Sequence, residues 1–223
     1  AKDTDYDGLP DKWEADNGYS PTNAEDMGAD SDGDGLRLAQ EQWLGTNPSD
    51  PDSGPDSDGV LRREIWDGIG GYGVISLTSN GNFPTNVSSV TFHCALACPT
   101  DRGEDYGSRV RGYIVAPQTG TYEFWVTGDD ETQFWLSSST NKFDRWRLGI
   151  MAGATYLDEF DKYETQYSGP VQLVGGQRYY FEVLHKEGGG GDTIGVLWSI
   201  AGGRREVIPS SVLRQYVAGA ADT

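Results

Sequence analysis

Residue types that build common active sites are scarce in this sequence of 223 residues. It holds two histidines, two cysteines and two methionines. His93 and His185 stand far apart in the chain, and the sequence has no serine-hydrolase, zinc-protease or phosphate-loop motif. Acids are plentiful enough to supply a pair of carboxylates for glycoside cleavage, but a carboxylate neutralised by Ca²⁺ is a poor proton donor. We therefore expect a protein that is not an enzyme.

Long apolar runs are missing as well, and none approaches the roughly 20 residues that a membrane span needs. The formal net charge is −18, which repels nucleic acid and anionic lipid. We therefore expect neither nucleic-acid partners nor membrane insertion. The sequence has no secretion signal and no initiating Met, so we expect a mature piece or an excised fragment of a longer protein.

The two cysteines, Cys94 and Cys98, are separated by three residues. A short-loop disulfide is favoured, because other features of the chain suggest an extracellular protein. Two buried free thiols are the alternative. Two cysteines without further ligands do not predict a metal site.

Glycine and aromatic residues are plentiful, with 31 Gly, 12 Tyr and 7 Trp. Short aromatic and β-branched runs alternate with turn residues after position 61, whereas residues 70–86 are expected to form a loop. This pattern predicts that residues 61–223 form an antiparallel β-sandwich and that the chain is mainly β. The predicted strands cover residues 89–95, 108–116, 120–127, 132–138, 145–151, 170–174, 177–185 and 193–199.

Residues 1–60 carry most of the negative charge, with sixteen acidic and three basic side chains. Acids at this density need counter-ions, and the first cluster has the spacing of a twelve-residue calcium loop. Carboxylates occupy loop positions 1, 3 and 5, and Gly8 allows the sharp bend at position 6. The ligands predicted for this loop are Asp3, Asp5, Asp7, the Leu9 carbonyl, Asp11 and Glu14.

The same loop pattern recurs 27 residues later. Its predicted ligands are Asp30, Asp32, Asp34, the Leu36 carbonyl and Glu41. Each loop leads into an expected short helix, over residues 9–15 and 36–44. An acidic disordered linker would not place Gly and Glu correctly twice, so two Ca²⁺ ions are expected.

A third acidic cluster runs from Asp50 to Asp58 with broken spacing. It could complete a neighbouring calcium site, but a linker is favoured. The D-x-D-x-D-G-L pattern, the helix after it and the sequence GTNP at 45–48 resemble the thrombospondin type-3-like calcium repeats of secreted bacterial proteins. The resemblance covers residues 3–59 and implies a calcium-stiffened connector between modules over residues 1–60.

Asp129 and Asp130 lie between two aromatic-rich runs, which predicts a β-hairpin with the acidic pair at its tip. Adjacent carboxylates repel, and successive side chains of an extended strand point to opposite faces. A sharp turn would aim both at one spot, where a hard cation such as Ca²⁺ could neutralise them. A solvated aspartate pair that only favours the turn is the alternative.

Four consecutive glycines, from Gly188 to Gly191, precede Asp192. Such a run does not stabilise a strand, but it lets backbone carbonyls approach an ion or a ligand closely. A loose hairpin loop is the alternative. Charged residues at both ends of the run favour a binding site.

Six segments after residue 61 share their sequence pattern with one domain family. They are REIW at 63–66, YGSRVRGYI at 106–114, TGTYEFW at 119–125, GDD at 128–130, GQRYY at 176–180 and residues 185–192. Together they closely resemble the family named after the amino-terminal region of anthrax protective antigen. That family is a β-sandwich attached to adhesins, glycosidases, toxins and proteases, and the resemblance covers most of residues 61–217.

In lectin members of that family, a cis-linked Asp-Asp pair holds a Ca²⁺ ion that coordinates vicinal sugar hydroxyls. The resemblance implies this role for Asp129 and Asp130, which bind one more Ca²⁺ in the β-sandwich. A second loop supplies further ligands in the family. In this sequence, the resemblance implies that the Gly190 and Gly191 carbonyls and Asp192 are these further Ca²⁺ ligands.

This sequence also departs from the family pattern. It lacks the Asn that fungal members have in the second loop, so the resemblance does not identify which sugar is bound. Glu131 stands where a Gly follows the aspartate pair, and it adds negative charge. Gln133 is a further predicted sugar contact, and Trp146 is a candidate for stacking on a sugar ring.

The expected function is that of a calcium-dependent carbohydrate-binding module in a secreted or cell-surface protein, which the resemblance makes bacterial. Its expected partners are glycans and the other domains of the parent protein. Weak single-site affinity would be strengthened by multivalency. The alternatives are a calcium-stiffened spacer without a ligand and an accessory part of a polysaccharide-degrading enzyme.

Overall fold

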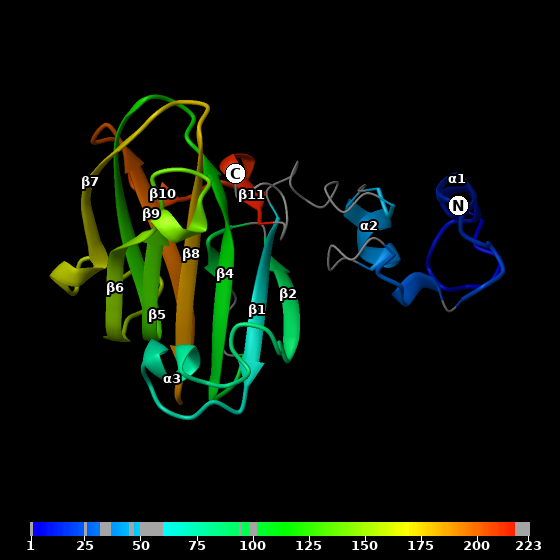
Figure 1. The fold of residues 1–223 in the computed structure, drawn as a ribbon, viewed down its shortest axis with the longest axis horizontal. Helices are drawn as coiled ribbons and strands as arrows, with labels where there is room; N and C mark the ends of the chain where they lie inside the picture. Colours follow the sequence, from blue (N-terminus) through cyan, green and yellow to red (C-terminus); the bar gives the residue numbers. More distant parts are fainter. Residues whose placement is uncertain are drawn as a thin grey trace. The chain divides into compact units, whose positions relative to one another are not determined.

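The computed structural model describes residues 2–24, 26–31, 37–44, 47–49, 60–93, 95–98 and 102–216. Their contacts define two compact units, one within residues 1–57 and the other within residues 58–216. The smaller unit consists of loops and short helices, and the larger one is built of strands (Figure 1). No helix among the described residues is long and apolar enough to cross a membrane.

The smaller unit contains α1 (Asp11–Asn17), the short 3-10 helix η1 (Asp26–Gly28) and α2 (Leu38–Leu44). α1 ends at Gly18, whose φ of 83° is the left-handed conformation that glycine adopts after a helix. Leu9 and Leu38 are fully buried. Both helices expected after the acidic loops are present.

The larger unit contains eleven strands and one short α-helix among its described residues. In chain order they are β1 (Leu61–Asp67), α3 (Val74–Thr78), β2 (Ser89–His93), β3 (Ala97–Cys98), β4 (Tyr106–Val115), β5 (Gly120–Leu136), β6 (Trp146–Ala154), β7 (Tyr167–Leu173), β8 (Arg178–Glu187), β9 (Thr193–Ile200), β10 (Glu206–Val207) and β11 (Leu213–Gln215).

Antiparallel pairing joins these strands in the order β10-β9-β5-β8-β4-β1-β2. β6 and β7 also pair with β5, β3 pairs with β9, and β11 pairs with β4. α3 lies across one end of the strands (Figure 1). The predicted mainly β, antiparallel sandwich is confirmed.

β5 is the strand on which the two layers meet. Its first half pairs with β9 and β7. Its second half pairs with β6 from Asp129 on and with β8 from Glu131 on. Between the halves the chain bends so sharply that a Cβ on Gly128 would lie 2.4 Å from the Cβ of Thr132. Phe124 and Phe134 consequently meet in the core, with their ring centroids 5.3 Å apart.

The predicted hairpin at residues 120–138 is therefore wrong, although the predicted sharp turn is present. A hairpin requires its two strands to bond to each other. Here each half of β5 finds a different partner, because the turn carries the chain from one layer of the sandwich to the other.

The segment predicted as a loop at residues 70–86 contains α3. Its Leu77 is fully buried and packs with Trp66 and Ile69, so apolar contact supports a helix in a Gly-rich region. Cys98 is buried, and Cys94 lies outside the described residues. The disulfide therefore stays a prediction.

Candidate functional site

Two bends lie side by side where β8 ends and β9 begins. One is the bend of β5 at Asp129 and Asp130, and the other is the connection at residues 188–192. The pairing of the strands sets this arrangement, because Asp129 pairs with Thr193 of β9 and Glu131 pairs with Lys186 of β8. The glycine-rich connection must therefore pass beside the aspartate pair.

Three carboxylates in this place could hold a metal ion. One oxygen each from Asp129, Asp130 and Glu187 lies within 4.8 Å of the others, and the peptide bond between the two aspartates is cis. Glu187 is fully buried, and neither of its oxygens makes a hydrogen bond of normal geometry to a described residue. A buried carboxylate is costly, and a cation can offset its charge. The fully buried Lys186 ammonium already interacts with Glu187 and Asp130, and the three carboxylates leave room for further positive charge.

The pKa values of the group reflect its crowded negative charge. Burial, followed by repulsion from Asp130 and Asp192, raises the pKa of Asp129 to about 6. Burial and the two neighbouring aspartates raise the pKa of Glu187 to about 7, although the Gly189 amide acts in the opposite direction. A divalent cation would reverse this electrostatic situation, because it favours the ionised carboxylates.

Glycines let the connection approach the aspartate pair. The Gly188 amide donates to a carboxylate oxygen of Asp130 at 2.9 Å. A side chain at position 188 would come within 2.6 Å of the Tyr72 ring, so only glycine fits there without a shift. A Cβ on Gly191 would lie 3.5 Å from Asp129 Oδ2, which places the Gly191 backbone beside the pair.

Asp192 and Gly190 lie at the edge of this group. Asp192 is 2% exposed, and its Oδ2 accepts hydrogen bonds from the Tyr106 hydroxyl and the Arg102 amide. Its Oδ1 is buried and has no hydrogen-bonding partner among the described residues. The Gly190 amide donates to Glu104 at 2.8 Å, which fixes the outer part of the connection.

Gln133 lies away from the aspartate pair. Its side-chain amide donates to Glu131 at 2.5 Å, and its oxygen accepts from the Trp135 indole at 3.1 Å. These three side chains line a groove beside Val74 and Ile75 of α3. The structure thus gives the Gln133 amide bonds to residues of its own strand.

The prediction that Trp146 could stack on a sugar beside the acidic pair is wrong. Trp146 is 41% exposed, but it pairs with Leu136 at one end of β6, whereas Ala154 at the other end pairs with Asp129. Eight residues of extended strand separate the two positions by about 26 Å. The sequence did not indicate which tryptophan lies exposed beside the acidic pair.

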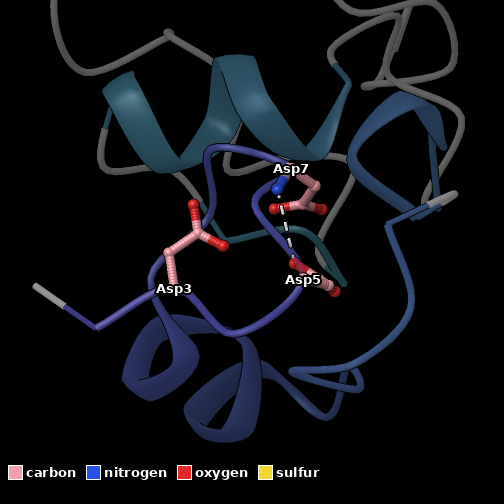
Figure 2. A group of neighbouring side chains, drawn as sticks. All are labelled: Asp3, Asp5 and Asp7. Carbon is pink, nitrogen blue, oxygen red and sulfur yellow. Dashed lines mark hydrogen bonds between the residues drawn. The ribbon is translucent and has the colours of Figure 1, made fainter.

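The first acidic loop of the smaller unit brings its aspartates together. Asp3, Asp5 and Asp7 form one group that could hold a metal ion (Figure 2). Asp7, Glu14 and Asp26 form a second group, which shares Asp7 with the first. Glu14 is fully buried, with both oxygens unpartnered among the described residues. Burial and the surrounding aspartates raise the pKa of Glu14 to about 6.

Two other ligands predicted for this loop have different surroundings. Asp11 accepts hydrogen bonds from Lys2 and Thr4, which lower its pKa, and it belongs to neither acidic group. Leu9 is buried, and its amide donates to Asp7 at 2.7 Å. Asp11, the first residue of α1, therefore ties the start of the helix to Lys2 and Thr4.

The second predicted calcium loop falls largely outside the described residues. Asp32, Asp34 and Leu36 are among those not described, as is the segment from Asp50 to Gly59. Asp30 is exposed and Glu41 is fully buried. The second site and a third site near Asp50–Asp58 stay predictions.

Sequence reasoning missed two members of the acidic groups, Asp26 and Glu187. Asp26 belongs to η1, far from the loop motif that it joins. Glu187 stands one residue before the glycine run, at the end of a strand that pairs with the second half of β5. Its position beside the glycine run could have marked Glu187 as a candidate ligand. Whether its side chain lies beside the aspartate pair depends on the register between β8 and β5, which the sequence does not give.

In the comparison with protein families, the model described as the PA14 domain matches residues 72–211. Among curated proteins, the mouse N-acetyl-beta-glucosaminyl-glycoprotein 4-beta-N-acetylgalactosaminyltransferase 1 is 31% identical over 166 residues, which are 71% of this chain and 16% of the transferase. Dog fibrocystin is 31% identical over 91 residues, which are 37% of this chain and 2% of fibrocystin. The chain thus spans a small part of these relatives.

Solved structures share the fold at low sequence identity. A PA14 sugar-binding domain from an RTX adhesin has a TM-score of 0.54 and 14% identity, covering 70% of this chain and 98% of that one. The epithelial adhesin 9 A domain from Candida glabrata, in complex with Galβ1-3GlcNAc, has a TM-score of 0.51 and 11% identity. That match covers 72% of this chain and 93% of the adhesin domain.

Proposed function

Because the chain belongs to the PA14 domain family, we propose that its β-sandwich is a calcium-dependent carbohydrate-binding module. The proposal rests on Glu187, a buried carboxylate whose oxygens make no hydrogen bond of normal geometry to a described residue, beside Asp129 and Asp130. A bound cation would relieve the repulsion within this group. The similar adhesin domain that is named as sugar-binding, and the one solved with a disaccharide, support a sugar as the ligand.

The donor set fits Ca²⁺, which takes 6–8 oxygen ligands in flexible geometry. Asp129, Asp130 and Glu187 would supply carboxylate oxygens, and the Gly191 backbone lies beside Asp129. Asp192, whose charge acts on Asp129 and whose Oδ1 has no partner among the described residues, is a further candidate ligand. Gly190 is the remaining candidate from the connection. A bound ion would offer its open positions to the hydroxyls of a sugar.

We propose that the β-sandwich is not itself an enzyme. His185 is fully buried, its Nε2 lies 2.8 Å from the Asp129 carbonyl, and burial lowers its pKa to about 3. A buried histidine bound to the backbone holds the bend and cannot reach a substrate. The mouse transferase extends far beyond the matched 16% of its length, which leaves ample room for catalysis elsewhere in that protein.

For the smaller unit, we propose calcium sites that stiffen a connection between modules. The two groups that share Asp7 support this role, because their repulsion would be relieved by bound ions. A module of this kind suits a secreted or cell-surface protein, with glycans and the other domains of the parent protein as partners. The adhesin origin of the similar structures supports a cell-surface location.

A glycan array in millimolar Ca²⁺, followed by calorimetry on the best glycan, tests the proposal. The chain should bind, and Asp129→Asn combined with Asp130→Asn should abolish the part of the binding that EDTA removes. The matched control is Asp144→Asn combined with Asp158→Asn, because neither residue belongs to the acidic groups. Calcium-dependent binding that survives the substitution at 129 and 130 would defeat the ion-mediated mechanism. Absence of binding to a broad panel would instead favour a structural spacer.

A further inference from the structure

A second pocket of about 700 Å³ lies on the outer face of the layer that contains β9. Glu123 and Trp125 of β5 and Ser199 of β9 line it, and they alternate with core residues such as Phe124. The segment before η4 (Glu164–Gln166) and the turn between β9 and β10 complete the walls. Its volume lies within the range of roughly 300–1,000 Å³ that is common for small-molecule sites.

The pocket contains a stacked aromatic arrangement. Tyr167 stacks on Trp125 with ring centroids 5.3 Å apart, and the Arg205 guanidinium lies 4.2 Å from the Trp125 centroid. Trp125 is 5% exposed, whereas Tyr167 and Tyr163 at the rim are 40% and 46% exposed. The rim therefore exposes two tyrosine rings, one of which is backed by the buried Trp125. The apolar face of a pyranose ring packs well on such aromatic rings.

The polar groups of the pocket include both donors and acceptors. Glu123 accepts hydrogen bonds from the Tyr167 hydroxyl and, at 3.2 Å, from the Ser199 hydroxyl. Arg205 forms an ion pair of 2.6 Å with Asp161. Sugar hydroxyls both donate and accept, so they match this mixed lining.

The charges in the pocket narrow the ligand class. Its lining includes the acids Glu123, Asp161 and Glu164 against the single base Arg205, so an anionic sugar would be repelled. Arg205 already occupies the position beside the Trp125 ring that a cationic ligand would take. The remaining match is a neutral sugar.

We propose that this pocket is a second carbohydrate site, which takes neutral pyranose sugars and needs no metal ion. Trp125 precedes Asp129 by four residues on β5, so the two sites are separated by about 13 Å along the strand. One module could then hold two parts of a branched or repeated glycan. Two weak sites that are engaged together would raise the avidity without any new contact at the aspartate pair.

The test uses the full chain with Asp129→Asn and Asp130→Asn in millimolar CaCl₂, so that the smaller unit keeps its ions. The probes are lactose, cellotriose, maltotriose and chitotriose. Their binding is measured by saturation-transfer NMR and by tryptophan fluorescence. At least one sugar should bind with a millimolar dissociation constant. Adding Tyr163→Ala should weaken this binding at least fivefold, and adding Glu123→Gln should weaken it several-fold.

Phe143→Ala is the matched control, because Phe143 is 74% exposed and lies outside the pocket. It should leave the residual binding unchanged. Absence of binding to every probe, or binding that Tyr163→Ala does not weaken, would overturn the second site. Preferential binding of trilysine over the sugars would overturn the ligand class. Failure of the calcium mechanism would be seen separately, as equal sugar binding with and without the aspartate substitutions.

Discussion

The hydroxyl of Tyr106 donates a hydrogen bond of 2.8 Å to Asp192, and this bond ties β4 to the glycine-rich connection. The backbone amide of Arg102 donates to the same carboxylate oxygen at 2.7 Å. Both bonds fix one oxygen of Asp192 and leave the other buried without a partner among the described residues. Because Oδ2 is held by two bonds, the unpartnered Oδ1 of Asp192 would be available as a ligand for a cation.

Tyr106→Phe should weaken Ca²⁺ binding by the β-sandwich severalfold, because Asp192 loses one of the two bonds that hold it. The loss of stability should be about 1 kcal/mol. Tyr180→Phe is the control, since the Tyr180 hydroxyl also donates to a buried carboxylate, that of Glu182 at 2.9 Å. Terbium titration and thermal unfolding would measure both variants. Equal calcium affinity in the two variants would contradict a positioning role for Tyr106.

Glu187→Gln should have opposite effects with and without calcium. Without the ion, it removes a buried unpaired charge and should raise the unfolding temperature of the β-sandwich. With the ion, it removes a ligand and should reduce the stabilisation that calcium gives. Near-UV circular dichroism during heating, in EDTA and in CaCl₂, measures both effects.

Glu182→Gln on the same strand is the matched control for that experiment. Glu182 is buried too, but it pairs with Arg145 and accepts from Tyr180. Its replacement should therefore lower the unfolding temperature in both conditions. If Glu187→Gln behaves in the same way, Glu187 is not an unpaired member of the acidic group.

Removal of calcium should unfold the smaller unit, which would lose the helical circular dichroism signal of α1 and α2. Glu14→Gln should lower its calcium affinity about tenfold, because Glu14 lies in an acidic group. Asp11→Asn should change the affinity much less, because Asp11 is bound to Lys2 and Thr4. A larger loss for Asp11→Asn would restore the ligand assignment that the loop motif predicts.

Gly128→Ala should abolish calcium binding in the β-sandwich and destabilise it by about 1–3 kcal/mol. A Cβ at this position would lie 2.0 Å from Thr132 Oγ1, so the bend beside the aspartate pair would have to open. Gly120→Ala on the same strand meets no atom within 4 Å and should stay within about 0.5 kcal/mol of the wild type. Chemical denaturation of both variants decides between these outcomes.

Stability should also depend on His93 in mild acid. Burial and the nearby Arg63 charge lower the pKa of His93 to about 4, so the folded chain binds fewer protons than the unfolded chain between that value and 6.5. The free energy of unfolding should therefore fall as the pH drops through this window, by less than about 1.4 kcal/mol per pH unit. His93→Gln should flatten the curve. Parallel curves for the two proteins would exclude this contribution.

Local patterns predicted the parts of the site that follow one another in the chain. The alternating aspartates before α1, the Asp129–Asp130 pair and the glycine run are all visible as short motifs with chemical meaning. The structure places Asp3, Asp5 and Asp7 in one group and sets the glycine run beside the aspartate pair. The turn at the pair was predictable for the same reason, because two adjacent carboxylates interrupt an aromatic strand.

Features that depend on strand register were not predictable. Glu187 joins the aspartate pair only because β8 pairs with the second half of β5, and no local pattern specifies that pairing. The dependence on strand pairing also explains why the hairpin prediction and the predicted position of Trp146 were wrong. The second pocket follows from outward residues of two strands and a loop, which a single sequence does not bring together.

The pairing of β5 on both sides has a mechanical consequence. Most of its residues bond to one neighbour on each side, among β6, β7, β8 and β9, and the aspartate pair sits in its middle. Tension applied through a glycan held at this pair would enter the interior of the sheet and would load many hydrogen bonds in shear at once. A domain loaded in this way resists being pulled apart one strand at a time.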